Sequence, residues 1–148
     1  MTTSSAAAGP TRLQVLFEQR LPTPAAPGLP FTFVRTADLA TVRRRVQAHT
    51  AAAALSADAA YNLTLAVHEL AVDALTHGGG TLLLGREHAA LVCEVRDSRH
   101  ASLPGTAPRH PRLNPSHRRG LWLADQLCDL VEVRSGPWGT AARITTWL

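Results

Sequence analysis

The strongest hydrophobic pattern in the chain lies in residues 56–80. Its apolar residues recur at three- and four-residue intervals: Leu63, Val67, Leu70 and Ala74. This spacing predicts an amphipathic helix with one buried face. Ser56 can cap the start of the helix, and three glycines at 78–80 can end it, because glycine adopts backbone conformations that stop a helix. Glu69 and Asp73 are four residues apart, so both carboxyl groups are expected on one helix face.

Apolar spacing and turn residues also predict the elements on either side of this helix. They are a strand at 31–34, a helix at 38–54, strands at 81–85 and 91–97, a helix at 121–130, and strands at 130–134 and 140–148. In this order they predict an α+β fold. We expect a two-layer α/β sandwich, with a mixed, mainly antiparallel sheet and helices on one face.

The strand at 91–97 shows a clear alternation of side chains. Leu91, Cys93 and Val95 alternate with Val92, Glu94 and Arg96, which is typical of a strand with one buried face. Cys93 and Cys128 both lie in apolar patterns, so we interpret them as core thiols.

Two segments have no hydrophobic period. Residues 1–30 are rich in proline and alanine and are expected to form a flexible N-terminal segment, followed by a domain at 31–148. Within that segment, residues 13–17 could form either a strand or a partner-docking segment. The segment of residues 98–119 is too long for an ordinary connection, and long loops of this kind are usually lids, binding loops or disordered segments.

Composition and charge narrow the class of protein. The chain has 148 residues, 45% of them hydrophobic, which is enough for one domain with a core. No apolar run is long enough to cross a bilayer, so we expect a cytoplasmic protein without a membrane partner. All fifteen basic residues are arginine, and no basic patch interleaved with aromatic residues predicts direct nucleic-acid binding. The run Arg43-Arg44-Arg45 is either a solvated face or a surface for an acidic partner.

The motifs resemble a known family. A helix carrying Glu69 and Asp73, a strand ending at Asp97, a long lid and a Gly-Leu helix start at Gly120 follow the order of the GHKL (Bergerat) ATPase fold. The run RRGLWLADQLCDLVEVRSGPWGT is similar to the C-terminal end of RsbW-like anti-sigma factors and serine-protein kinases. The resemblance covers most of the chain after residue 30. It implies a regulator that binds a sigma factor, an antagonist of the anti-sigma factor, or both, and that forms a homodimer.

The resemblance also implies roles for individual residues, with ATP and Mg²⁺ as cofactors. Glu69 would be the general base of a serine-protein kinase, and Asp73 would hold the Mg²⁺ ion. Asp97 would accept a hydrogen bond from the adenine amino group. The remaining nucleotide-binding positions would be Arg99, Arg118, Arg119, Gly120, Leu121 and Thr140. The helix that Gly120 opens would offer N–H groups to phosphate oxygens.

Three positions depart from the family pattern. Asp73 stands where the family has asparagine, and Arg99 and Arg118 stand where it has glycine. Carboxylate is a good ligand for Mg²⁺, and the arginines could grip a triphosphate through charge-assisted hydrogen bonds. Alternatively, the arginines are solvated lid residues of a site that no longer binds ATP. The chain would then be a catalytically inactive protein-interaction module.

Overall fold

Six strands and three α-helices form the part of the chain that the structure, a computed structural model, describes. This part comprises residues 13–17, 29–97, 115–136 and 139–148. The elements, in chain order, are β1 (Leu13–Phe17), β2 (Phe31–Phe33), a 3-10 turn (Thr36–Asp38), α2 (Leu39–Ala52), α3 (Ala57–Leu75), β3 (Gly80–Glu87), β4 (Ala90–Asp97), α4 (Pro115–Leu127), β5 (Leu130–Gly136) and β6 (Gly139–Trp147). None of the described helices is long and apolar enough to cross a membrane.

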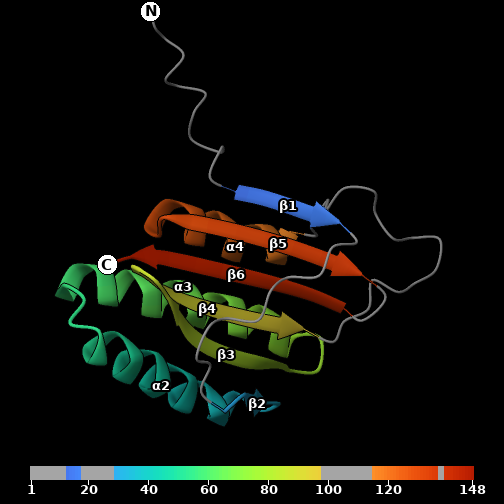
Figure 1. Cartoon of the computed structure of the whole chain (residues 1–148). Coiled ribbons are helices and arrows are strands. Elements are labelled where there is room, and N and C mark those ends of the chain that lie inside the picture. Colours follow the sequence, from blue (N-terminus) through green and yellow to red (C-terminus); the bar gives the residue numbers. More distant parts are fainter. Residues whose placement is uncertain (1–12, 18–28, 98–114, 137–138) are drawn as a thin grey trace, which may run out of the picture.

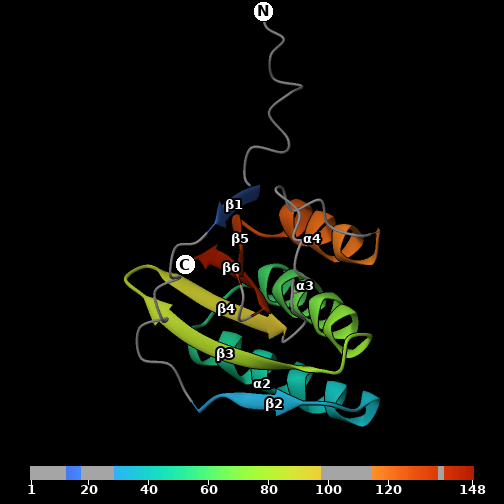
Figure 2. The ribbon, with the colours of Figure 1, turned by 90° about the vertical axis from the view of Figure 1, so that its right-hand side faces the viewer.

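The strands form one sheet in the order β1-β5-β6-β4-β3-β2 (Figure 1). Neighbouring strands from β2 to β5 are antiparallel, and β1 at the edge runs parallel to β5. Helices α2, α3 and α4 lie on one face of this sheet, with α3 between the other two (Figure 2). The predicted two-layer α+β sandwich with a mixed, mainly antiparallel sheet is therefore confirmed.

Helix α3 is central to the core. Its buried residues include those of the predicted apolar face: Leu63, Val67, Leu70 and Ala74. The Oγ atom of Ser56 accepts a hydrogen bond from the Ala59 N–H at 3.1 Å, which confirms the predicted cap. At the other end, the Gly79 N–H donates to the Ala74 carbonyl at 2.9 Å, and Gly79 has a φ of +114°. A Cβ atom there would lie 2.4 Å from the Phe33 carbonyl oxygen, so this position requires glycine.

Residues 13–17 are a strand. Their partners in β5 run from Leu13 opposite Val131 to Phe17 opposite Ser135. Part of the N-terminal segment that we expected to be flexible therefore pairs with the sheet. Residues 1–12 and 18–28 of that segment lie outside the described part of the chain.

Helix α4 begins earlier than predicted. It starts at Pro115, six residues before the expected start at Leu121, so residues 115–119 of the predicted lid are helical. Proline is well suited to a first helical turn because it has no N–H to leave unpaired and its φ is fixed near the helical value. The segment before Leu121 has no apolar repeat, which hid the helix start from pattern analysis. Residues 98–114 of the predicted lid lie outside the described ranges.

The expectation that β4 has one buried face is wrong. Val92 and Glu94, on the face away from the helices, are 1% and 0% exposed. The Glu94 carboxylate accepts hydrogen bonds from Arg143 on β6, at 3.2 Å from Nε and 3.0 Å from Nη2. It also accepts a hydrogen bond from Arg96. A polar residue in an alternating pattern was taken for a solvent-facing one, but this glutamate is buried with its charge paired.

Cys93 and Cys128 are both buried and neither forms a disulfide. Burial raises the pKa of the Cys93 thiol, because a thiolate would lose its hydration in the core. The interpretation of these residues as core thiols is confirmed.

We predict that Glu94→Ala destabilises the protein by about 3–5 kcal/mol, because Arg143 would remain buried without this acceptor. The free energy of unfolding in urea measures the loss. Glu87→Ala is the matched control: the Glu87 carboxylate is 4.0 Å from Nη1 of the same arginine, and its side chain is 38% exposed. This substitution should cost less than about 1 kcal/mol. Equal losses in the two variants would contradict a structural role for the buried pair.

Candidate functional site

Four of the residues that the sequence singled out meet at one small cavity. Asp73 comes from the end of α3, Asp97 from the end of β4, Leu121 from α4 and Thr140 from the start of β6. The other lining residues are apolar: Leu70, Ala74, Val95, Val133 and Ala142. The cavity therefore lies between the helix layer and the sheet, at the end of the sheet where β4 finishes and β6 begins.

Regular secondary structure places the acidic residues at this cavity. Asp97 is the last residue of β4 and lies opposite Thr140 in the register with β6. Asp73 is three residues after Leu70, one of the core residues of α3, and therefore points to the same side of the helix. Asp73 and Asp97 are each only 5% exposed. Two carboxyl groups are thus held in a largely apolar, buried setting.

The side chains at the cavity have the chemistry of a nucleotide site. The cavity itself is too small for a nucleotide. A buried carboxylate can accept a hydrogen bond from an amino group, and carboxylate oxygen is a favoured ligand of Mg²⁺. The cavity volume is about 20 Å³, which is room for one water molecule or two. Pockets for small-molecule ligands typically have about 300–1,000 Å³. Leu121, one of the residues that line the cavity, is only 2% exposed.

Glu69 and Gly120 lie where α3 and α4 cross. Glu69 is partly exposed and does not line the cavity. A Cβ atom on Gly120 would lie 3.3 Å from Cδ2 of Leu70 and 3.6 Å from the Glu69 carbonyl oxygen. The glycine thus allows the two helices to approach closely. Glu69 and Asp73 share a helix, as predicted, but Asp73 is buried at the cavity and Glu69 is beside α4.

The prediction that Gly120 opens a helix is wrong. Gly120 is the sixth residue of α4, beyond the four N–H groups that lack a partner within a helix. The N–H groups that lack a partner within this helix belong to its first turn instead. Arg99 lies outside the described residues, and so do the side chains of Arg118 and Arg119. The structure does not test the predicted phosphate contacts of these three arginines.

No group of three or more potential metal-ligating residues occurs among the residues that the structure describes. A metal ion at Asp73 would therefore need further ligands from phosphate and water. Mg²⁺ is commonly bound in this way, by one or two carboxylates together with phosphate oxygens and water molecules.

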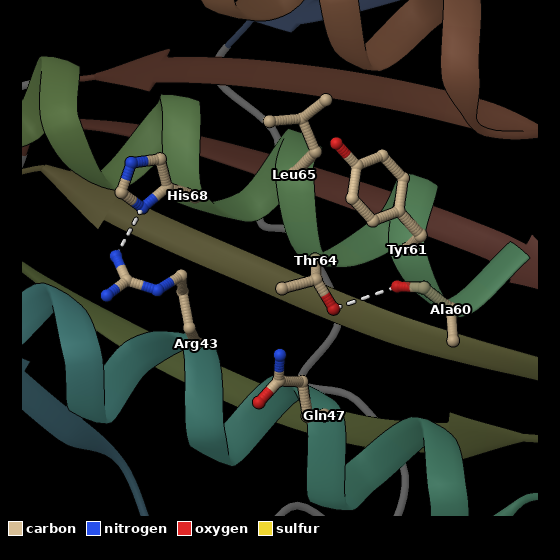
Figure 3. A pocket seen from close by; sticks show the side chains of 7 residues that line it. All are labelled: Arg43, Gln47, Ala60, Tyr61, Thr64, Leu65 and His68. Atoms are coloured by element: carbon tan, nitrogen blue, oxygen red, sulfur yellow. Dashed lines mark hydrogen bonds between the residues drawn. The ribbon is translucent and has the colours of Figure 1, made fainter. Parts of the chain in front are cut away.

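Sequence analysis missed a groove between α2 and α3, lined in part by Tyr61, Leu65 and His68 of α3 (Figure 3). These residues recur at helical spacing, on the opposite side of the helix from its core residues. The recurrence was a signal in the sequence. It was hidden because histidine and tyrosine do not stand out as an apolar stripe.

Comparison with protein families identifies the class to which this fold belongs. Residues 34–146 match the model of the histidine kinase-like ATPase domain. The match covers most of the chain, so the chain belongs to this family. The resemblance inferred from the order of the motifs is confirmed.

Comparison with solved structures gives the same fold. The crystal structure of the RsbU and RsbW domains of Rv1364c from Mycobacterium tuberculosis matches 82% of this chain with a TM-score of 0.59 and 17% identity. This chain spans about a third of that protein, 33% of its length. The crystal structure of the SiaB-SiaC complex from Pseudomonas aeruginosa matches 82% of this chain and 89% of the other, with a TM-score of 0.57 and 8% identity. A comparison with curated proteins found no significant match.

We predict that Gly120→Ala changes stability by no more than about 1 kcal/mol, because the helix preference of alanine is offset by a Cβ atom that would lie 3.3 Å from Cδ2 of Leu70. Gly120→Val should cost about 1–3 kcal/mol, since its branched side chain would push α4 away from α3. Urea unfolding measures both changes. Gln126→Val, at an exposed position of α4, is the control and should cost a few tenths of a kcal/mol. A loss from Gly120→Ala as large as that from Gly120→Val would contradict this prediction.

Proposed function

We propose that this chain is a cytoplasmic regulator of the anti-sigma-factor type that binds ATP and Mg²⁺ at the cavity between α3, α4 and the sheet. The observation that carries the proposal is the convergence of Asp73, Asp97 and Thr140 on this cavity in a member of the histidine kinase-like ATPase family. The acidic residues come from two elements far apart in the sequence. Each lies in the position that the family motifs assign to a nucleotide contact.

Each residue has a defined task in this proposal. Asp97 accepts a hydrogen bond from the adenine amino group, and its burial strengthens that bond by excluding water. Asp73 holds Mg²⁺, which would neutralise charge on the phosphates when bound. Glu69, nearer the surface at the crossing of α3 and α4, takes the proton of an attacking serine hydroxyl.

The remaining residues bind the nucleotide. Thr140 and Leu121, which line the cavity, would contact it from β6 and α4. Arg99, Arg118 and Arg119 contact the phosphates.

Nucleotide binding at this cavity requires a movement of α4. Leu121 is the residue of α4 that lines the cavity, and Gly120, the residue before it, packs against the turn of α3 that holds Glu69 and Leu70. Moving Leu121 away would therefore also change the surroundings of Glu69. In this proposal, opening the cavity and exposing the general base are one event.

The proposed partner is a sigma factor, an antagonist protein, or both. One of the similar structures contains an RsbW domain together with an RsbU domain, and the other is a complex of SiaB with SiaC. Each of these structures contains more than one protein or domain, which supports a role in protein contacts. We propose that this chain likewise acts through protein contacts, as a homodimer.

A second candidate function is a protein-interaction module that does not bind ATP. Two observations favour it: the cavity has only about 20 Å³, and Gly120 lies inside α4 instead of at its start. The departures from the family pattern at Asp73, Arg99 and Arg118 also favour a module that does not bind ATP. Such a module would keep the scaffold and its partner surfaces without nucleotide chemistry.

We predict that ATP with Mg²⁺, at about 100 times its Kd, stabilises the protein by about 2.7 kcal/mol, which raises the melting temperature by roughly 5–10 °C. Asp97→Ala should abolish this shift, because the adenine amino group loses its acceptor. Asp58→Ala, at an exposed position in the first turn of α3, is the control and should keep the shift. Each variant is compared with its own nucleotide-free form by thermal unfolding and by calorimetry.

The outcomes separate the two candidate functions. Absence of binding by the unaltered chain at millimolar ATP and Mg²⁺ would favour the inactive module. A shift that survives Asp97→Ala would exclude the assigned adenine contact. If binding persists in Glu69→Gln while phosphoryl transfer to a serine-containing partner is lost, Glu69 is the general base.

A further inference from the structure

A groove of about 340 Å³ runs between α2 and α3 on the outer surface of the helix layer (Figure 3). Arg43 and Gln47 of α2 form one wall, and Tyr61, Leu65 and His68 of α3 form the other. The hydroxyl of Thr64, which also lines it, donates to the Ala60 carbonyl at 2.8 Å. None of these residues lines the cavity that contains Asp73 and Asp97.

The three consecutive arginines of α2 have different surroundings. Nη2 of Arg44 donates to Oγ1 of Thr41 at 3.0 Å, and the guanidinium of Arg45 lies 4.8 Å from the centre of the Phe31 ring. Arg43 is the one of the three that lines the groove, and its Nη1 is 3.2 Å from Nδ1 of His68. Arg43 is therefore not simply part of a solvated face, which was one of the two interpretations of this run.

The contact between Arg43 and His68 gives one end of the groove a defined chemistry. Arginine can only donate, so Nδ1 of His68 is the acceptor in this contact. The guanidinium has five N–H groups, most of them not used by this contact. The guanidinium can therefore donate to an anion at this end while it stays in contact with His68, which lies beside it in Figure 3.

The charge and the apolar surface of the groove are complementary to an occupant that is acidic and partly apolar. None of the seven residues that line the groove in the described part of the chain is acidic, and α2 contains three arginines and a histidine but no carboxylate. Tyr61 is 67% exposed and, together with Leu65, offers an apolar surface next to the cationic end. A large aromatic side chain exposed in this way is typical of a residue that anchors a protein contact.

We propose that this groove docks an acidic amphipathic helix of a protein partner. One carboxylate of that helix binds Arg43, which His68 holds at the end of the groove, and an apolar residue about one turn away packs against Tyr61 and Leu65. An extended segment fits less well, because the backbone groups of both walls are already hydrogen-bonded within helices and cannot pair with a strand. The site is separate from the proposed nucleotide cavity, so docking does not depend on ATP.

A selection from a displayed library of random 16-residue peptides, without nucleotide, tests this proposal. The expected result is enrichment of net-negative peptides with a large apolar residue at helical spacing from an acidic one. A peptide synthesised from the enriched set should bind about tenfold more weakly, or worse, to Arg43→Gln and to Tyr61→Ala. Its Kd for Arg44→Gln, which removes the same charge one residue away, should stay within twofold. Melting temperatures confirm that the variants fold.

Several outcomes would overturn the proposal. They are a lack of enrichment, enrichment of neutral or basic peptides, and equal weakening by Arg43→Gln and Arg44→Gln, which would indicate non-specific attraction. An unchanged Kd after replacement of the peptide's acidic residues by glutamine would also overturn it. If light scattering shows a dimer that Tyr61→Ala dissociates, the groove holds a second copy of this chain instead. A shift in melting temperature with ATP has no bearing on any of these results.

Discussion

The buried pair of Glu94 and Arg143 holds together the two strands on which the cavity depends. The two residues lie directly opposite each other in the register of β4 and β6, and three residues further along the same ladder Asp97 lies opposite Thr140. A slip of one residue would turn every side chain of one strand to the other face and would separate the buried charges. Such a slip would cost several kcal/mol. The pairing of these charges therefore also keeps Asp97 and Thr140 together.

Helix α3 supplies the second constraint. Its apolar residues must face the sheet, and this requirement fixes the rotation of the helix about its axis. Once that rotation is set, the period of 3.6 residues places Asp73 on the inner side at the cavity and Tyr61, Leu65 and His68 on the outer side. The same burial energy therefore positions both the acidic cavity and the groove.

The sequence predicted those features that rest on local pattern. The cap at Ser56, the glycine stop and the apolar face of α3 were found because each has a residue signature within one element. The start of α4 was missed because residues 115–120 carry no apolar repeat, and the burial of Glu94 was missed because its partner is 49 residues away. The meeting of Asp73, Asp97, Leu121 and Thr140 followed from the order of family motifs. The groove was not predicted, because the histidine and tyrosine on its α3 wall do not stand out as an apolar stripe and because it also depends on how two helices are rotated against each other.

The free energy needed to open the cavity bears on the choice between the two candidate functions. Opening it exposes Leu121, and uncovering one leucine side chain costs about 1.5–3 kcal/mol. If the open form is rarer by that free energy, the apparent affinity for a nucleotide falls by roughly tenfold to a hundredfold. A penalty of this size weakens binding without abolishing it. The closed cavity alone therefore does not make the chain an inactive module. Under the proposed function, the departures from the family pattern at Arg99 and Arg118, where the family has glycine, are then the stronger argument for a chain that does not bind ATP.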